Sequence, residues 1–318
     1  MMQAAEQYIG VDVSKAELVI AQAGGQLCRV SNDVAGISGW LEQVSQPALI
    51  AMESTGRYHG LLAQLAHEAG VTVYVLNARD VYFYAKTLGS RAKTDGVDAT
   101  VIARYLVEHH ARLRPWRPGS ALQQRLQGLL ARRAQLTGHR TALRQALAGG
   151  ELQGIDVQPL HSSFAQVIEA IDATVQALID GDAELGQGCA RLRTIIGFGP
   201  QAAALLTVLL SRLQLASADA LVAYCGLDPR PNDSGARRGR RRLTKKGPPL
   251  LRRQIYLVGC AAAGSKALKP LYQSIRAQGF ATTEAALILG RKLLRAAFAI
   301  WKNSKPFDPA RLLPPKSA

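Results

Sequence analysis

The stretch Tyr8-Ile-Gly-Val-Asp12-Val-Ser-Lys15 places one carboxylate inside an apolar run that is typical of a buried β-strand. Burying an unpaired carboxylate costs several kcal/mol or raises its pKa until it protonates. An aspartate in such a strand therefore needs a cationic partner, a hydrogen-bond network or a metal ion.

Three more carboxylates offer a shared metal ion as the answer. A second apolar run, Ala48 to Met52, ends at Glu53, and Asp95 and Asp98 share one face of a helix if a helix begins there. Such groups repel one another unless a cation lies between them, and hard oxygen ligands select Mg²⁺ or Mn²⁺. Two such ions on a phosphodiester stabilise the attacking and leaving oxygens. Taken singly, the helix acids and Glu53 have ordinary explanations; taken together with Asp12, the four predict a metal site.

Charge divides unevenly along the 318 residues, whose formal net charge is +16. Residues 1–110 contain 8 Lys and Arg against 11 Asp and Glu, and the remainder contains 31 against 12. A mildly acidic part followed by a strongly basic part fits a carboxylate active site that works on a polyanion. Because the cations cluster, nucleic acid is favoured over acidic lipid.

Two other classes of protein are disfavoured. The longest apolar stretches fall short of the roughly 18 residues that a membrane span needs, and the first residues lack a signal pattern, so we expect a cytoplasmic protein. Cys28, Cys189, Cys225 and Cys260 are scattered, which predicts reduced, mostly buried thiols rather than a zinc site or disulfides.

The first part predicts an α/β fold, a mixed sheet with flanking helices. Strand patterns cover 8–21, 26–30, 48–52 and 71–76, with a hairpin turn at Gly24-Gly25, and helical patterns cover 37–44, 59–69 and 97–108. The proline-rich stretch Arg114 to Gly119 marks a natural boundary.

The second part is mainly helical. Residues 121–148 predict one long helix. A heptad seam then runs through Phe164, Ile168, Ile171, Val175, Leu178, Leu185, Cys189 and Leu192, interrupted only by Asp182. These helices either form an antiparallel hairpin within one chain or pair between chains. Residues 254–263 and 283–301 predict two further helices, and 306–318 a loose tail.

Two features of the basic part suit phosphate groups. Gly197 and Gly199 precede a helix, so their backbone N–H groups can approach a phosphate, although a plain glycine turn explains them equally well. The densest charge lies between Arg230 and Arg253, where we expect a solvated or disordered phosphate-binding arm. Its candidate contacts are Arg237, Arg238, Arg240, Arg241, Arg242, Lys245, Lys246, Arg252 and Arg253. Ser234, just before this cluster, is either a turn residue or a nucleophile for a phosphoserine linkage.

Six motifs, in this order, resemble the DEDD transposases of bacterial insertion sequences, family 110 with its 1111 subgroup. The motifs are Tyr-Ile-Gly-Val-Asp12-Val-Ser-Lys, Met-Glu53-Ser-Thr-Gly-Arg-Tyr, Arg-Ala-Lys-Thr-Asp95-Gly-Val-Asp98-Ala, Ile-Ile-Gly197-Phe-Gly-Pro, Ala-Tyr-Cys225-Gly-Leu-Asp-Pro and Asp-Ser234-Gly. The arginine run at 237–242 is denser than the family's usual pattern.

The resemblance implies a RuvC-like, RNase H-type nuclease domain at 1–118 with Asp12, Glu53, Asp95 and Asp98 as metal ligands. It implies a helical hairpin or coiled coil at 119–192, a helical domain at 193–305 with Ser234 as nucleophile, and a tail at 306–318. It also implies DNA ends and target as substrates, a noncoding guide RNA encoded by the element, and a homo-oligomer, from dimer to tetramer, whose composite sites combine the acids of one chain with the serine of another.

Three alternatives remain open at this stage. A metal-dependent, junction-resolving nuclease would leave Ser234 as a mere turn residue. An actin-like sugar kinase shares the Ile-Gly-Val-Asp12-Val-Ser pattern but requires a second glycine-rich phosphate loop that the sequence lacks. A pure binding protein, the third alternative, would keep its cellular activity when Asp12 is changed to Asn.

Overall fold

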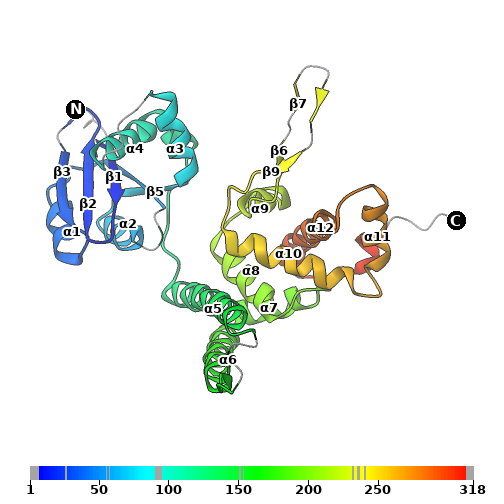
Figure 1. The fold of residues 1–318 in the computed structure, drawn as a ribbon. Helices are drawn as coiled ribbons and strands as arrows, with labels where there is room; N and C mark the ends of the chain where they lie inside the picture. Colours follow the sequence, from blue (N-terminus) through cyan, green and yellow to red (C-terminus); the bar gives the residue numbers. More distant parts are fainter. Residues whose placement is uncertain are drawn as a thin grey trace. The chain divides into compact units, whose positions relative to one another are not determined.

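A computed structural model describes residues 7–25, 27–54, 56, 58–89, 95–149, 152, 154–230, 233–234, 237–239 and 241–312. The chain divides into two compact units, Met1–Pro118 and Gly119–Ala318 (Figure 1). The helical hairpin and the later helices thus belong to one unit.

A five-stranded mixed sheet forms the centre of the first unit. Its strands are β1 (Gln7–Val13), β2 (Glu17–Gln22), β3 (Leu27–Ser31), β4 (Ala48–Glu53) and β5 (Thr72–Leu76), in the spatial order β3-β2-β1-β4-β5. The first three pair antiparallel, whereas β4 is parallel to β1 and β5 is parallel to β4. The predicted α/β class, a mixed sheet with flanking helices, is confirmed.

Helices cover both faces of this sheet (Figure 1). Alternate residues of β1 and β4 pack with α1 (Val34–Leu41) and α2 (His59–Glu68) in one apolar cluster. The other face packs with α3 (Ala78–Thr87) and α4 (Asp95–His109), which the short 3₁₀ helix η1 (His110–Arg112) follows. Because successive strand residues point to opposite faces, β1, β2, β4 and β5 each contribute to both layers.

Two elements of this unit differ from the sequence prediction. The run expected as one strand over 8–21 is two antiparallel strands, because Ser14 and Glu17 close a tight turn through bonds of 2.8 and 3.0 Å. Helix α3 was not predicted. Its signals were the cap Asn77, whose side chain accepts from the Arg79 backbone N–H, and an inward stripe at Val81, Tyr84, Ala85 and Leu88.

The second unit is mainly α-helical, as predicted. Its helices are α5 (Ala121–Ala146), α6 (Gln158–Asp180), α7 (Ala183–Arg193), α8 (Pro200–Arg212), α9 (Ala218–Tyr224), α10 (Pro249–Ala263), α11 (Lys269–Ala277), α12 (Thr282–Asn303) and the 3₁₀ helix η3 (Pro309–Leu312). Helices α10 and α12 pack closely through glycines. A Cβ on Gly259 would lie 1.9 Å from the Ala286 carbonyl oxygen, and one on Gly290 would lie 2.5 Å from that of Ile255.

The heptad seam is broken where Asp182 interrupts it. The Asp182 side chain accepts a 3.0 Å bond from the Leu185 backbone N–H and caps α7, so α6 and α7 are separate helices. Helix α6 packs against α5 within the chain, with Leu126, Leu130 and Val175 in the shared core. The hairpin within one chain is therefore the pairing that the structure contains.

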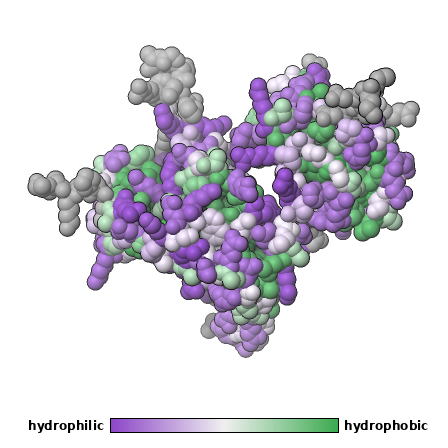
Figure 2. Space-filling view, turned by 180° about the vertical axis from the view of Figure 1, so that it is seen from behind, coloured by the Kyte–Doolittle hydropathy of each residue, from purple (hydrophilic) through white to green (hydrophobic). Residues whose placement is uncertain are grey.

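The face of the molecule shown in Figure 2 is mostly polar. Hydrophilic side chains cover much of the face shown in Figure 2, and apolar residues lie between them in separate patches. In the part of the chain that the structure describes, no helix is both long and apolar enough to span a membrane. Of the four cysteines, Cys189 and Cys225 are buried but Cys28 and Cys260 are exposed, so the expectation of mostly buried thiols holds for two of them.

Candidate active site and nucleic-acid interface

Asp12 lies on the sheet face that α4 covers. Its neighbours Val11 and Val13 are buried in the opposite layer, so alternation places Asp12 on the same face as Gly10. Helix α4 passes very close to that face. A Cβ on Gly10 would lie 2.2 Å from both the Ala103 nitrogen and the Ala99 oxygen. The side chain of Asp12 is half-buried there.

Glu53 lies level with Asp12 on the neighbouring strand. The parallel pairing of β1 with β4 aligns Val11 with Met52, and Asp12 and Glu53 are the next residues of the two strands. Parallel strands lie about 4.8 Å apart, and residues in register point to the same face. The two carboxylates therefore stand side by side on one face of the sheet.

The first turn of α4 contains Asp95 and Asp98. Ala99, which follows Asp98, packs against Val19, the residue that pairs with Asp12 across β1 and β2. At the far end of the helix, His110 lies 3.5 Å from the Tyr8 hydroxyl at the start of β1. Helix α4 thus begins toward the Asp12 end of β1, where its N-terminal backbone N–H groups also favour negative charge.

The four acids approach one end of one sheet face, but they do not form a closed metal cluster. Among the described residues, no three His, Cys, Asp or Glu side chains are gathered so that they could hold a metal ion. Residues 90–94, directly before Asp95, lie outside the described part. The donor set nevertheless fits a hard divalent cation, since every member is a carboxylate.

Sequence reasoning missed Asn32, which ties the ends of two strands together. Its amide nitrogen donates to the Ser14 carbonyl at 2.8 Å and to the Tyr58 carbonyl at 3.3 Å. Ser14 comes two residues after Asp12, and Tyr58 lies in the loop after Glu53. Asn32 therefore links the two segments that follow the acids, one after β1 and one after β4. An isolated Asn after a strand carried no signal for this role.

Ser234 lies in a β-hairpin that projects from the helices of the second unit (Figure 1). At its base, β6 (Pro229–Arg230) pairs antiparallel with β9 (Arg242–Leu243). Nearer its tip, β7 (Asp233–Ser234) pairs with β8 (Arg237–Arg238), so that Ser234 stands opposite Arg237 in the backbone register. The arginine-rich segment, expected as a solvated or disordered arm, forms a β-hairpin over its described residues.

The base of this hairpin is anchored to the helices. The Arg252 guanidinium of α10 donates to the Gly247 carbonyl and, at 3.2 Å, to the Lys245 carbonyl. Gly226 at φ +65° allows the two hairpin ends to meet, because a Cβ there would lie 2.7 Å from the Gly247 nitrogen. The buried Thr244 hydroxyl donates to the Asp228 carboxylate. Arg252 therefore anchors the base of the β-hairpin to α10.

The remaining predicted cations divide between hairpin and helix. Arg241, Arg242, Lys245 and Lys246 are exposed in the returning arm, and Arg253 is exposed on α10. The side chains of Arg237 and Arg238 and all of Arg240 lie outside what the structure describes.

The two glycines before α8 have different surroundings. Gly197 has φ +91°, and a Cβ there would lie 2.6 Å from the Val258 carbonyl oxygen, so its close approach is to α10. Gly199 is exposed at the N-cap of α8, and a Cβ there would meet no atom within 4 Å. Of the pair, Gly199 is the residue whose surroundings leave room for a phosphate; that role stays a prediction.

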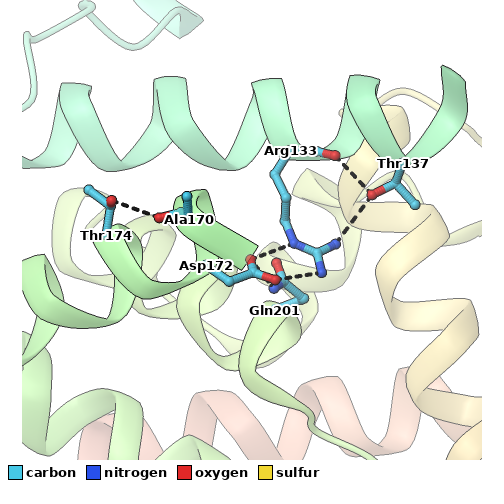
Figure 3. A network of polar contacts seen from close by, with 6 residues as sticks. All are labelled: Arg133, Thr137, Ala170, Asp172, Thr174 and Gln201. Carbon is cyan, nitrogen blue, oxygen red and sulfur yellow. Dashed lines mark hydrogen bonds and ion pairs between the residues drawn. The ribbon is translucent and has the colours of Figure 1, made fainter. Parts of the chain in front are cut away.

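A polar network connects α5 and α6, the two helices of the antiparallel helical pair, to α8 (Figure 3). The Arg133 guanidinium donates to both Asp172 carboxylate oxygens, at 2.6 and 2.9 Å, and the Gln201 amide donates to one of them at 2.6 Å. Partial burial works to raise the pKa of Asp172, but the bonds from Arg133 and Gln201 and the Arg133 charge outweigh it, so that the pKa is lowered. The network holds α5, α6 and α8 together.

Comparison with known proteins identifies the class. A DEDD transposase model of the IS110 type matches residues 9–150, and a model described as "Transposase IS116/IS110/IS902 family" matches residues 189–273. The pilin gene-inverting proteins of Moraxella bovis and Moraxella lacunata are each 28% identical over 319 residues, which span 95% of this chain and 97% of theirs. A Thermus thermophilus RuvC structure matches at 16% identity and a TM-score of 0.25, over 35% of this chain and 99% of its own.

The protein is therefore an enzyme of the DNA transposase and recombinase class. Within that class, the chain belongs to the IS116/IS110/IS902 family of transposases, whose two models together match more than half of its length. Nuclease folds of the DEDD or RuvC-like type generally use divalent metal ions.

Proposed function

We propose that this transposase cuts and rejoins DNA strands through a phosphoserine intermediate on Ser234, together with a carboxylate site made of Asp12, Glu53, Asp95 and Asp98. One observation carries the proposal. Asp12 and Glu53 stand level on one sheet face, and the helix with the other two acids begins toward the same end of β1. Its substrates are the DNA ends of the element and the target.

The serine step conserves the energy of the phosphodiester. The Ser234 oxygen forms a bond to phosphorus as the bond from phosphorus to a deoxyribose oxygen breaks. The serine loses a proton, and the departing oxygen takes one up to become a hydroxyl. Attack by a deoxyribose hydroxyl of another strand reverses the step and rejoins DNA without an external energy source.

Each half of the protein supports a distinct part of this chemistry. The hairpin presents Ser234 in a segment dense in arginine, whose charge would stabilise the negative charge that develops on phosphorus. When bound by the four carboxylates, Mg²⁺ or Mn²⁺ would stabilise the attacking and leaving oxygens. The ordered anchor at Arg252 would hold the serine segment at a fixed place relative to α10.

The test is a search for protein joined covalently to DNA. The full chain is incubated with Mg²⁺ and element-end DNA and then separated in detergent. We expect an adduct that disappears in Ser234→Ala and in Asp12→Asn but persists in Ser274→Ala, which removes an exposed serine of α11. Strand cleavage that persists in Ser234→Ala without any adduct would refute the serine mechanism and leave a metal-dependent nuclease.

Guide RNA and assembly are separate parts of the proposal. The family order of the six motifs supports recognition through a noncoding RNA of the element and a homo-oligomer, from dimer to tetramer, that acts in the cytoplasm. Purifying the chain with its element's flanking DNA co-expressed should yield a defined RNA. Light scattering should give a mass of two to four chains. Recombination that survives ribonuclease treatment would contradict the guide.

A further inference from the structure

Helix α3 presents an unusual outward face. Arg79, Tyr82, Phe83 and Lys86 follow one another at helical steps of three, one and three residues, which place them on one side. The opposite side packs into the core through Val81. Tyr82 and Phe83 are 55% and 49% exposed. A solvent-facing helix side normally carries polar residues, so two adjacent exposed aromatic rings require a reason.

The cations on this face accompany the rings. The Lys86 ammonium lies 4.8 Å from the Tyr82 ring centroid, and the Arg79 guanidinium lies 5.5 Å from that of Phe83. The two rings meet edge to face, with centroids 5.5 Å apart. A nucleotide whose base stacked on either ring would therefore have its phosphate near a cation.

Charge around α3 runs against the trend of its unit. Residues 78–94 contain four of the eight Lys and Arg residues of residues 1–110, but one of the eleven Asp and Glu residues. The segment therefore carries a formal charge of +3 in a unit whose other residues are net negative, which favours a polyanion. Contact with a second copy of the chain, the other possible occupant of this face, would not require so many cations.

Helix α3 begins near the candidate acids, because it follows β5, whose last residue Leu76 pairs with Glu53. It packs on the same layer as α4 but leads away from the acids: the Tyr84 and Tyr105 ring centroids lie 5.1 Å apart, and Tyr105 is in the second half of α4, whereas Asp95 and Asp98 are in its first turn. A strand held along α3 would therefore come nearest the carboxylate end of the sheet at the Arg79 end of the helix.

We infer that this face of α3 binds unpaired DNA by stacking bases on Tyr82 and Phe83 while Arg79 and Lys86 contact the adjoining phosphates. Unpaired DNA is the fitting occupant because the bases of a duplex already stack on one another and do not offer their faces to a side chain. The site would hold an unpaired strand that leads away from the carboxylates along α3. The inference rests on the proposed function for its substrate.

The experiment uses the full chain and photo-crosslinking. An oligothymidylate of about 12 nucleotides with one 5-iodo-deoxyuridine is irradiated with the protein at high salt, which weakens the sequence-blind binding of the basic unit. Trypsin cleavage after Arg79 and Lys86 releases residues 80–86 as one peptide. We expect the crosslink on that peptide, and competition by excess unlabelled oligothymidylate but not by duplex DNA.

Matched variants decide the outcome. Changing Tyr82 and Phe83 together to Leu keeps apolar volume but removes the rings, and should lower the crosslink on residues 80–86 at least about fivefold. Phe280→Leu, an exposed aromatic of the other unit, should leave it unchanged. Ser234→Ala should give the same crosslink on residues 80–86 but no phosphoserine adduct. The crosslink therefore tests the α3 face, and the adduct tests the serine mechanism, independently of each other.

Several results would overturn the inference. One is a crosslink confined to peptides of residues 119–318, and another is an unchanged yield in the double Leu variant. Stronger competition by oligouridylate than by oligothymidylate would assign the face to RNA. The face would instead be a contact between chains if the parent protein gave no crosslink and the double Leu variant had a lower assembly mass in light scattering.

Discussion

Gly10 of β1 lies directly against the backbone of Ala103 in α4: a Cβ built on Gly10 would be 2.2 Å from the Ala103 nitrogen. This contact sets how closely the helix approaches the strand, and Asp12 stands two residues further along that strand. The glycine that the first motif contains is therefore a packing requirement of the candidate site. It lets a helix bearing two acids lie flat on a strand bearing a third.

Gly10→Ala should destabilise the first unit by about 1–3 kcal/mol, because the added methyl group meets backbone atoms that cannot move without shifting α4. Urea unfolding of the full chain, followed by circular dichroism, measures the change. Gly39→Ala is the matched control, since Gly39 is an exposed residue of α1 and a Cβ there meets nothing within 4 Å. A Gly10 variant as stable as the Gly39 variant would show that α4 does not depend on this contact.

The sequence was sufficient for the sheet and most of its helices because their apolar periodicity is strong. It was insufficient where a polar side chain ends an element. Ser14 closes a turn inside an apolar run, so that one expected strand is two. Asp182 caps α7 inside a heptad pattern, so that one expected seam belongs to two helices. In both cases a local hydrogen bond between side chain and backbone overrides the periodicity.

Arg242 and Arg252 should differ in their effect on DNA affinity, although both belong to the basic cluster. Arg242 is exposed on β9, so Arg242→Gln should lower the slope of log affinity against log salt by about one, as expected for one lost phosphate contact. Arg252 donates to the Gly247 and Lys245 carbonyls, so Arg252→Gln should leave that slope unchanged. Fluorescence anisotropy with duplex DNA over a salt series measures both slopes.

The same two variants should also differ in thermal stability, with the larger effect now at Arg252. Arg252→Gln leaves backbone carbonyls at the hairpin base without their donor and should lower the unfolding temperature, whereas Arg242→Gln should not. Equal slopes for the two variants, with equal unfolding temperatures, would contradict the division between an anchoring and a contacting arginine.

Thiol reactivity should divide the four cysteines into two pairs. Burial raises the pKa of Cys225 to about 12 and also raises that of the buried Cys189, so both thiols stay protonated and shielded at neutral pH. Cys28 and Cys260 are exposed. Titration with a disulfide reagent in the native state should modify two thiols, and all four after denaturation. Modification of Cys225 before unfolding would contradict the packing of α9.

The candidate site was harder to predict than the fold. Motif order pointed to Asp12, Glu53, Asp95 and Asp98, but their common location depends on strand register and on Gly10, neither of which a single residue announces. Asn32 gave no signal, because its two acceptors are carbonyls of distant segments. The exposed rings of α3 were missed because the helix itself was. Long-range pairing decides the location of the acids and the role of Asn32, whereas α3 had the local signals of the Asn77 cap and its apolar stripe.

Asp172→Asn should lower the free energy of unfolding by about 1–2 kcal/mol at pH 7, since it removes the charge that Arg133 and Gln201 surround while keeping the side-chain shape. The expected loss of stability is small because solvent screens the Asp172 carboxylate, which is about one-third exposed. Asp180→Asn on the same helix, an exposed acid bonded to Gln176, is the matched control and should cost much less.

The stability difference between the parent protein and Asp172→Asn should depend on pH, and its sign follows from the lowered pKa of Asp172. The folded protein binds the proton more weakly than the unfolded chain, so the stabilisation is fully present above the unfolded pKa of about 3.9 and is lost as the pH falls through the folded value. Unfolding curves of the parent protein and Asp172→Asn should therefore stay a constant distance apart from pH 7 to about 5 and converge below about 4. A gap that does not shrink as the pH falls below about 3.9 would show that the ionised carboxylate is not what stabilises the junction of α5, α6 and α8.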